Sequence, residues 1–223
     1  MSTTTISRTD HEIQASVQAE LGWTPNLDEA AIGVAVDNGT VTLSGEVDTY
    51  SQRVAAVKSA QRVRGVTTVA DELKVHPSAG FGPRTDTDIA EALHRSFGWS
   101  AQVPETVKAE VADHRVTLTG EVMWHYQREA ARRIAENMLG VTSVDNRITL
   151  TPRPTATDIE QRITNAIARS AALDAKHITV STRGDEVTLT GTVRSWAERS
   201  QAGRAAWNSP HVLKVHNYLS VAS

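Results

Sequence analysis

Hydrophobic and polar positions follow a pattern that occurs three times along the chain. The segment Val41–Val47, with the sequence Val-Thr-Leu-Ser-Gly-Glu-Val, returns in closely similar form at Val116–Val122 and at Val187–Val193. The copies begin 75 and 71 residues apart, which suits a very small domain better than a solenoid unit. We therefore divide the chain into a first, a second and a third repeat, at residues 9–75, 85–150 and 155–221.

Each repeat begins with the pattern of a capped amphipathic helix. A threonine stands three residues before an acidic residue, the spacing of a capping box, at Thr9–Glu12, Thr85–Asp88 and Thr155–Asp158. Apolar residues then recur at every fourth position: Ile13, Val17, Leu21; Ile89, Leu93, Phe97; and Ile159, Ile163, Ile167. These stripes predict helices that pack one face on a core. Because aspartate is shorter than glutamate, we expect the aspartate versions to return the capping hydrogen bond less well.

The period then changes to two, which predicts a pair of strands joined by a tight turn. The turn signal is clearest at Asn38-Gly39, similar at Gly184-Asp185 and weaker at Asp113-His114. The repeated motif places a glycine (Gly45 in the first repeat) on the expected buried face of the second strand. We interpret this glycine as room for a packed helix or a bulge.

A second helix and a last strand complete each repeat. Small residues such as Ala56 and Ala60 predict a helix that lies close to the sheet, and Gly65 predicts its C-terminal stop. In the third repeat Gly203 and Pro210 predict a shorter and less regular helix. The fold class is therefore α/β of the α+β sandwich type. It consists of three tandem α-β-β-α-β units, each a three-stranded sheet covered on one face by two helices.

These motifs together resemble the BON domain (bacterial OsmY and nodulation). The resemblance rests on V-T-L-[S/T]-G-x-V, on the pairs Gln52-Arg53, Gln127-Arg128 and Glu198-Arg199, and on G-V-x-x-V-x-N. Asp71 departs from the asparagine found at Asn146 and Asn217, and His211 departs from the glycine found at Gly65 and Gly140. The resemblance implies a non-catalytic bacterial module of osmotic or envelope stress. It implies phospholipid surfaces, small ligands or potassium as partners.

Net charge, cysteine content and the length of apolar runs exclude several classes of protein. Lys+Arg 23 against Asp+Glu 26 gives a formal net charge of −3, so we expect no nucleic-acid partner. The absence of cysteine excludes disulfides, cysteine-bound zinc and thiol catalysis, and favours the cytoplasm. The longest apolar run, Ala30 to Val36, is too short to span a bilayer, and the first residues contain no apolar signal core. We expect a cytoplasmic protein without a transmembrane segment.

No motif in the sequence predicts catalysis, a cofactor or a metal ion. The Gly80-Phe81-Gly82 segment indicates a linker rather than a nucleotide site, and Asp86-Thr87-Asp88 coincides with a helix start. The histidines are scattered without metal-ligand spacing. We therefore expect a binding or scaffold protein that is not an enzyme. Two alternatives stay open: a potassium sensor with backbone-carbonyl sites between units, and an enzyme with a site between units.

The aromatic residues suggest where a partner would bind. Trp23 and Trp99 follow the first helix of two repeats, and we interpret them as plugs over the small cores. The second repeat alone carries Met123-Trp124-His125-Tyr126 before its second helix. Because residues found in one repeat are not required by the shared fold, we predict a contact surface there, centred on Trp124, Tyr126, Arg128 and Arg132.

The expected partner of this surface is a second copy of the chain or another protein, with an anionic phospholipid surface as the alternative. The competing interpretation is structural. In that case the aromatic residues form a hydrophobic staple at the helix start, and Glu129–Arg133 is an ordinary i, i+4 ion pair.

Overall fold

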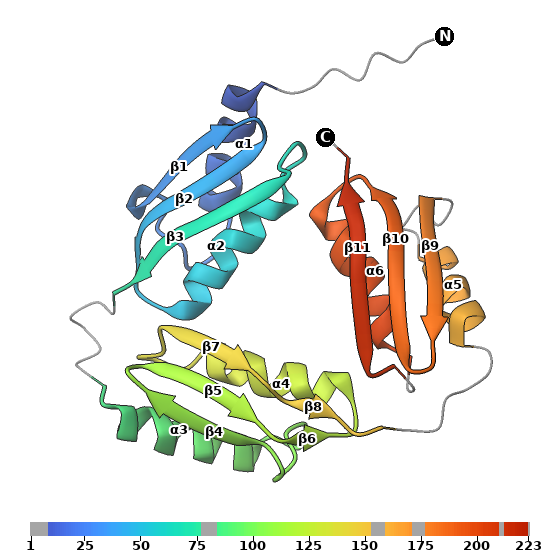
Figure 1. Ribbon diagram of the computed structural model, residues 1–223. Coiled ribbons are helices and arrows are strands. Elements are labelled where there is room, and N and C mark those ends of the chain that lie inside the picture. The colour runs from blue at the N-terminus through green and yellow to red at the C-terminus, as the bar shows by residue number, and fades with distance from the viewer. Residues whose placement is uncertain (1–8, 77–83, 153–158, 171–176, 210–211, 223) are drawn as a thin grey trace. The chain divides into compact units, whose positions relative to one another are not determined.

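A computed structural model describes residues 9–76, 84–152, 159–170, 177–209 and 212–222. Each repeat has the predicted element order (Figure 1). The first repeat contains α1 (Asp10–Gly22), a short 3-10 helix (Glu29–Ala31), β1 (Ile32–Asp37), β2 (Thr40–Val47), α2 (Tyr50–Arg62) and β3 (Thr68–Val75). The second contains α3 (Asp86–Trp99), β4 (Lys108–Ala112), β5 (Arg115–Thr119), β6 (Glu121–Val122), α4 (His125–Glu136), β7 (Ser143–Asn146) and β8 (Thr149–Leu150). The third contains α5 (Ile159–Ala168), β9 (Ile178–Arg183), β10 (Glu186–Val193), α6 (Trp196–Trp207) and β11 (Lys214–Val221).

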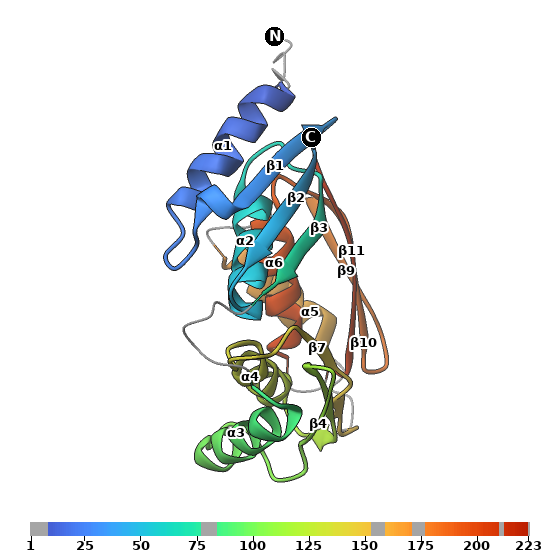
Figure 2. The same cartoon turned by 90° about the vertical axis from the view of Figure 1, so that its left-hand side faces the viewer.

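Each repeat forms a sheet whose middle strand is the second in sequence. The strand orders are β1-β2-β3, β4-β5-β7 and β11-β10-β9. The first two strands of a repeat pair antiparallel, whereas β7 and β11 pair parallel to the middle strand after a helical crossover. In the second repeat the strands are interrupted, so β6 and β8 form a separate parallel pair. Within each repeat both helices cover the same face of the sheet (Figure 2), as the sequence predicts.

The apolar stripes form the cores of their repeats. Every predicted stripe residue is buried except Phe97, which is partly buried. The core of the third repeat combines Ile159, Ile163 and Ile167 with the inner sides of β9, β10, α6 and β11. Helix α6 has 12 residues, as many as α4, so the prediction of a shorter helix is wrong. Gly203 instead leaves room for Asn217, whose Nδ2 would lie 3.2 Å from a Cβ at that position.

The motif glycines do not make room for a packed helix, which is one of the two predicted roles. Gly45, Gly120 and Gly191 have φ values of +115°, +124° and +122°. Gly45 and Gly191 are exposed, and Gly120 is partly buried. A Cβ on these glycines would lie 2.1, 2.3 and 2.0 Å from the carbonyl oxygens of Ala31, Thr106 and His177. The room is therefore needed by the backbone that leads into the neighbouring strand, and not by a helix.

An aspartate at the start of the first helix holds the hairpin turn in two repeats. The Asp10 carboxylate accepts hydrogen bonds from the N–H groups of Asn38 and Gly39, at 2.9 and 3.0 Å. Asp86 accepts from the N–H groups of Asp113 and His114, both at 2.9 Å. All four turn residues have positive φ. The turn with the weakest sequence signal is therefore well formed, because a carboxylate from the helix stabilises it.

The capping boxes form at both described helix starts. Glu12 and Asp88 each accept a hydrogen bond from the N–H of the capping threonine, at 2.9 Å. Asp88 therefore reciprocates as well as Glu12, contrary to the prediction, and its hydrogen bonds with Thr85 lower its pKa. The third pair, Thr155–Asp158, and the Gly80–Gly82 linker lie outside the described residues.

Candidate functional site

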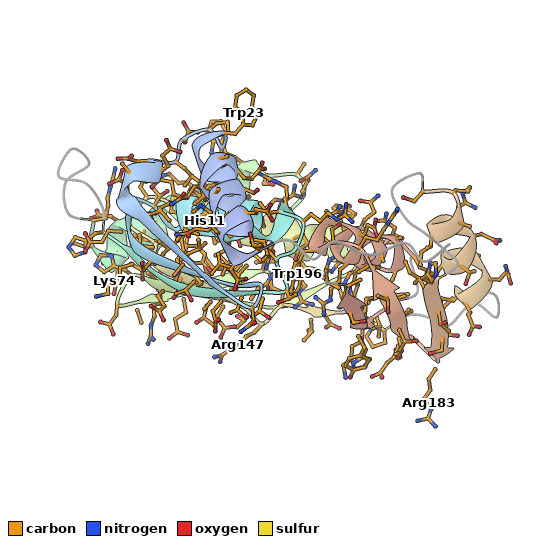
Figure 3. The ribbon with its side chains drawn as sticks, turned by 90° about the horizontal axis from the view of Figure 1, so that it is seen from above. His11, Trp23, Lys74, Arg147, Arg183 and Trp196 are labelled. Carbon is orange, nitrogen blue, oxygen red and sulfur yellow. The ribbon has the colours of Figure 1, made fainter. Side chains whose placement is uncertain are left out.

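Two tryptophans at equivalent positions of the first two repeats extend into solvent. Trp23 is 86% exposed and Trp99 is 91% exposed, and Figure 3 shows Trp23 projecting from the end of its helix. The prediction that they plug the cores is wrong. Each lies two residues after the last apolar stripe residue, and two residues turn a helix by about 200°, to the face opposite the core.

Charged side chains lie near the end of α1 that carries Trp23. Arg62 pairs with Glu20 at 2.8 Å, one turn before the tryptophan. The carboxylate of Glu29 lies over Gly22, since a Cβ there would lie 2.0 Å from Glu29 Oε2. The charged groups at this end of α1 are thus an Arg62–Glu20 ion pair and the carboxylate of Glu29. The third repeat has the exposed Arg169 at the equivalent position.

Trp124 begins helix α4 at a position where the other repeats carry a capping hydroxyl. Thr49 Oγ1 accepts a hydrogen bond from Gln52 N, and Ser195 Oγ accepts from Glu198 N, both at 3.2 Å. Trp124 makes no such side-chain cap, although Gln127 Oε1 accepts from its N–H at 3.0 Å. The indole is half-buried. A side-chain capping bond contributes about 1 kcal/mol. With tryptophan at this position, the start of α4 lacks that stabilisation.

Arg128 occupies a position that is arginine in all three repeats. In the third repeat, Arg199 Nε donates to the carbonyl of Leu219 at 3.0 Å and Nη2 donates to that of Asn217 at 2.7 Å. Its guanidinium also lies 5.0 Å from the centre of the Trp196 ring. Arg128 is half-buried, and its Nε is buried without an acceptor among the described residues. In the third repeat, Arg199 therefore joins helix α6 to the last strand, β11, by two hydrogen bonds.

The asparagine of the repeated motif joins the last strand to the second helix, and Asp71 in the first repeat lacks the hydrogen for one of its bonds. Asn217 Nδ2 donates to the carbonyl of Arg199 at 3.0 Å, and its Oδ1 accepts from Leu219 N at 3.3 Å. Asn146 makes the same two bonds in the second repeat. In the first repeat the Asp71 carboxylate accepts from Leu73 N at 3.2 Å, but an ionised carboxylate has no hydrogen to donate to the helix.

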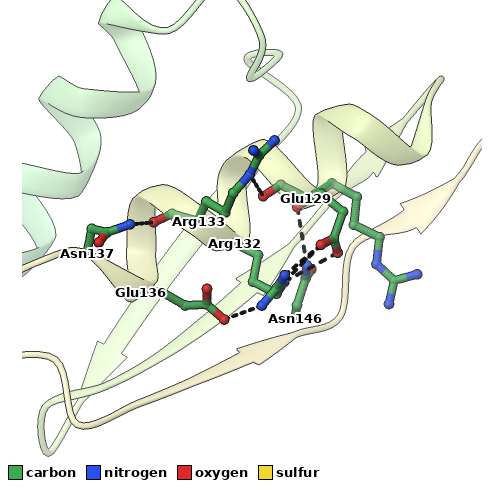
Figure 4. A network of polar contacts seen from close by, with 7 residues as sticks. Glu129, Arg132, Arg133, Glu136, Asn137 and Asn146 are labelled. Carbon is green, nitrogen blue, oxygen red and sulfur yellow. Dashed lines mark hydrogen bonds and ion pairs between the residues drawn. The ribbon is translucent and has the colours of Figure 1, made fainter. Parts of the chain in front are cut away.

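Arg132 is held by two carboxylates of its own helix (Figure 4). Arg132 Nη2 lies 2.6 Å from Glu129 Oε2, and Nη1 pairs with Glu136, which is only 7% exposed. Burial favours a raised pKa at Glu129, but the hydrogen bond and charge of Arg132 bring the pKa below its usual range. The predicted Glu129–Arg133 side-chain pair is not the contact that forms, because Arg133 Nε donates to the backbone carbonyl of Glu129.

The predicted surface thus contains side chains with very different exposure. Tyr126 is 53% exposed and its neighbour Met123 is 58% exposed. Trp124 and Arg128 are half-buried, and the charge of Arg132 is balanced within the helix. The exposed part of this surface is therefore aromatic and apolar rather than cationic.

His125 is expected to make the second repeat less stable at acidic pH. Burial lowers the pKa of His125, and the charges of Arg128 and Arg132 lower it further, although Glu129 opposes them. The folded protein then binds this proton less readily than the unfolded chain. The free energy of unfolding should therefore decrease as the pH falls below about 6.5, the ordinary pKa of histidine.

Replacing His125 with tyrosine, the residue that Tyr50 supplies at the equivalent position, should remove this part of the pH dependence. Urea denaturation of both proteins between about pH 7.5 and pH 5 measures it, because the other histidines contribute equally to both. Identical slopes of stability against pH would contradict the assignment.

Among the described residues, no group of three or more His, Cys, Asp or Glu side chains is placed to hold a metal ion. In the same part of the chain, no helix is both long enough and apolar enough to cross a bilayer. Asp86 and Asp88, the acidic residues of the D-x-D segment, bind backbone N–H groups of a turn and a helix start.

Two curated proteins are similar to this chain. The osmotically-inducible protein Y of Escherichia coli (strain K12) is 36% identical over 141 residues, which are 61% of this chain and 70% of that protein. The 21 kDa hemolysin of Actinobacillus pleuropneumoniae is 31% identical over 119 residues, 52% of this chain and 61% of that protein. The chain therefore spans less than two thirds of the length of the second relative.

Among solved structures, the C-terminal domain of CdsD, the structural protein of the type III secretion system of Chlamydia trachomatis, aligns with 97% of this chain and 100% of that chain. The sequence identity is 11% and the TM-score is 0.27.

The sequence model of one domain family matches the chain three times. The matches cover residues 9–77, 85–152 and 155–223, and they coincide with the three α-β-β-α-β repeats. They include the motif glycines, the paired arginines and the asparagines described above. The chain belongs to the BON domain family and carries three copies of the domain.

Proposed function

We propose that this protein is a non-catalytic binding protein of the bacterial osmotic stress response, and that exposed aromatic side chains make its main contacts. The observation that carries the proposal is the exposure of Trp23 and Trp99, at 86% and 91%. The similarity to the osmotically-inducible protein Y supports the link to osmotic stress. The cytoplasmic location and the potassium site stay predictions from the sequence.

The energetic argument concerns the fate of an exposed indole. Large aromatic side chains bury roughly 150–250 Å² each and contribute most of the energy in many interfaces. Trp23 and Trp99 stabilise neither core, since both project into solvent. Because the two repeats carry them at the same place, one chain offers two similar contacts, and two linked contacts bind more tightly than either alone.

The partner in this proposal is protein, first of all a second copy of the chain. Glu29, near the end of α1 that carries Trp23, would repel an anionic phospholipid headgroup, whereas the charge of Glu20 is balanced by Arg62. Tyr126 and Met123 extend the exposed aromatic and apolar surface of the second repeat, whereas Arg132 supplies little uncompensated charge. A protein surface offers apolar pockets for the rings and does not require cations around them.

The proposal is tested with the double variant Trp23→Ala and Trp99→Ala. Loss of the two rings should weaken self-association at least about tenfold, as removal of interface anchors does. The melting temperature should stay nearly unchanged, because both side chains are exposed. Sedimentation velocity across protein concentrations measures the association, and flotation with phosphatidylglycerol vesicles measures binding to lipid.

The control is Tyr218→Ala, which removes an aromatic side chain of 67% exposure from the third repeat. This variant should associate like the natural protein. Unchanged association of the double variant, or a natural chain that is monomeric at all concentrations, would contradict the proposal. If the double variant lost flotation with vesicles but kept its self-association, the partner of the two rings would be lipid and not protein.

A further inference from the structure

A groove in the second repeat runs between helix α3 and the outer side of strand β4. Its volume is about 610 Å³. Ala90 and Phe97 of the helix, Val103 of the following loop and Ala109 of the strand form apolar parts of its wall. His94, Glu105 and Lys108 supply its charged or titratable side chains.

The strand on this groove has unused backbone hydrogen-bonding groups. β4 is an outer strand, and within the described residues it pairs with β5 alone. The two-residue turn closes on the pair Ala112–Arg115, so the next pair, Val111–Val116, is a non-hydrogen-bonded pair. The N–H and C=O groups of Ala109 and Val111 therefore point away from β5, toward the outer edge. An outer edge of this kind is a template for another strand.

In the other two repeats a side chain of the first helix contacts the edge strand, at an outward backbone group in the first repeat and at a side chain in the third. In the first repeat, Gln14 Nε2 donates to the outward carbonyl of Val34 at 2.8 Å. In the third repeat, Glu160 Oε2 accepts from Thr182 Oγ1 of β9 at 3.3 Å. The second repeat has Ala90 at the equivalent position, immediately after the first stripe residue. A side chain of one methyl group cannot reach the strand, so the edge of β4 stays open to the groove.

We propose that this groove binds an extended peptide segment of a partner protein, with apolar residues at alternate positions and one acidic residue, which adds as a fourth strand to the outer edge of β4. Backbone groups of an extended peptide alternate at the same spacing as those of Ala109 and Val111. Alternate apolar side chains of the peptide pack on Phe97 and Val103. An acidic side chain of the peptide pairs with Lys108, which forms no ion pair with another described residue.

The occupant follows from the chemistry of the edge. A lipid chain or a small apolar ligand would fill the groove but leave the N–H and C=O groups of Ala109 and Val111 without partners. A peptide strand satisfies these groups and the apolar wall together. This site goes beyond the proposed function, because it uses backbone groups of β4 and not the exposed rings of Trp23 and Trp99.

The test uses a phage-displayed library of random heptapeptides, selected on the full chain and then synthesised. Fluorescence anisotropy compares binding of the selected peptides to the natural chain and to Ala90→Gln, which restores the side chain of the first repeat. We expect binding to weaken at least about tenfold in this variant, with an unchanged melting temperature. Hydrogen exchange should slow at the Ala109 and Val111 amides when the peptide is bound. Gln14→Ala is the matched control and should leave peptide affinity at the second repeat unchanged.

A second measurement does not depend on any variant. Selected peptides with N-methyl groups at alternate positions should bind the natural chain at least about tenfold more weakly in one of the two registers, because one register supplies the hydrogen bonds to β4. Equal binding by Ala90→Gln, equal binding by both N-methylated registers, or protection of amides outside β4 would overturn the proposal. Failure to select any peptide would overturn it as well, without affecting the role of Trp23 and Trp99.

Discussion

Replacing Gly191 with alanine is expected to unfold the third repeat. Its φ of +122° is unfavourable for any residue with a Cβ, and the new Cβ would lie 2.0 Å from the carbonyl oxygen of His177. That oxygen belongs to the backbone, so no side-chain movement removes the clash. Strain of this kind, at more than about 3 kcal/mol, is comparable with the whole stability of a small domain.

Gly184→Ala provides the matched control in the same sheet. Gly184 also has a positive φ, of +63°, but a Cβ there would have nothing within 4 Å. This variant should lose only about 1 kcal/mol, the penalty for a left-handed alanine. Urea denaturation and amide exchange by NMR distinguish the two. We propose that each repeat unfolds on its own, so Gly191→Ala should release the amides of the third repeat and leave those of the other two protected.

Equal losses in the two variants would show that the close approach of the His177 carbonyl adds no penalty at the motif position. Loss of protection in all three repeats would contradict the independence of the repeats.

The fold could be predicted from local patterns because its determinants are local. The stripe Ile13, Val17, Leu21 specifies a helix face, and the alternation in Val41–Val47 specifies a strand, without knowledge of distant residues. The role of Gly45 could not be predicted in the same way. Its constraint is the carbonyl of Ala31, which comes close only when the two strands have paired in their observed register.

The candidate site was harder to predict, for two different reasons. The exposure of Trp23 follows from helix geometry, since a residue two positions after Leu21 faces away from the core, so this signal was present in the sequence. The two carboxylates around Arg132 also stand at helical spacing, at Glu129 and Glu136. The open edge of β4 carries no such signal. Ala90 indicates an uncovered edge only when one knows that Gln14, its equivalent in the first repeat, donates a hydrogen bond to the edge strand.

Replacing Asp86 with alanine is expected to destabilise the second repeat by about 2 kcal/mol. Its carboxylate accepts two hydrogen bonds, from the N–H groups of Asp113 and His114, and charge-assisted bonds contribute more than neutral ones. Both turn residues have positive φ, at +50° and +62°, a conformation that is uncommon for any residue other than glycine. Removal of the carboxylate therefore takes away the hydrogen bonds that hold an unfavourable turn.

Asp10→Ala is the comparison that tests this reasoning. Asp10 makes the same two bonds in the first repeat, to Asn38 and Gly39. An Asn-Gly turn adopts positive φ at both residues by its own preference, so it should survive loss of the carboxylate with a smaller penalty, about 1 kcal/mol. Urea denaturation followed by amide exchange at each turn measures the two losses. Equal losses would mean that the carboxylate stabilises the helix start rather than the turn, because the helix starts are alike in the two repeats and the turns differ.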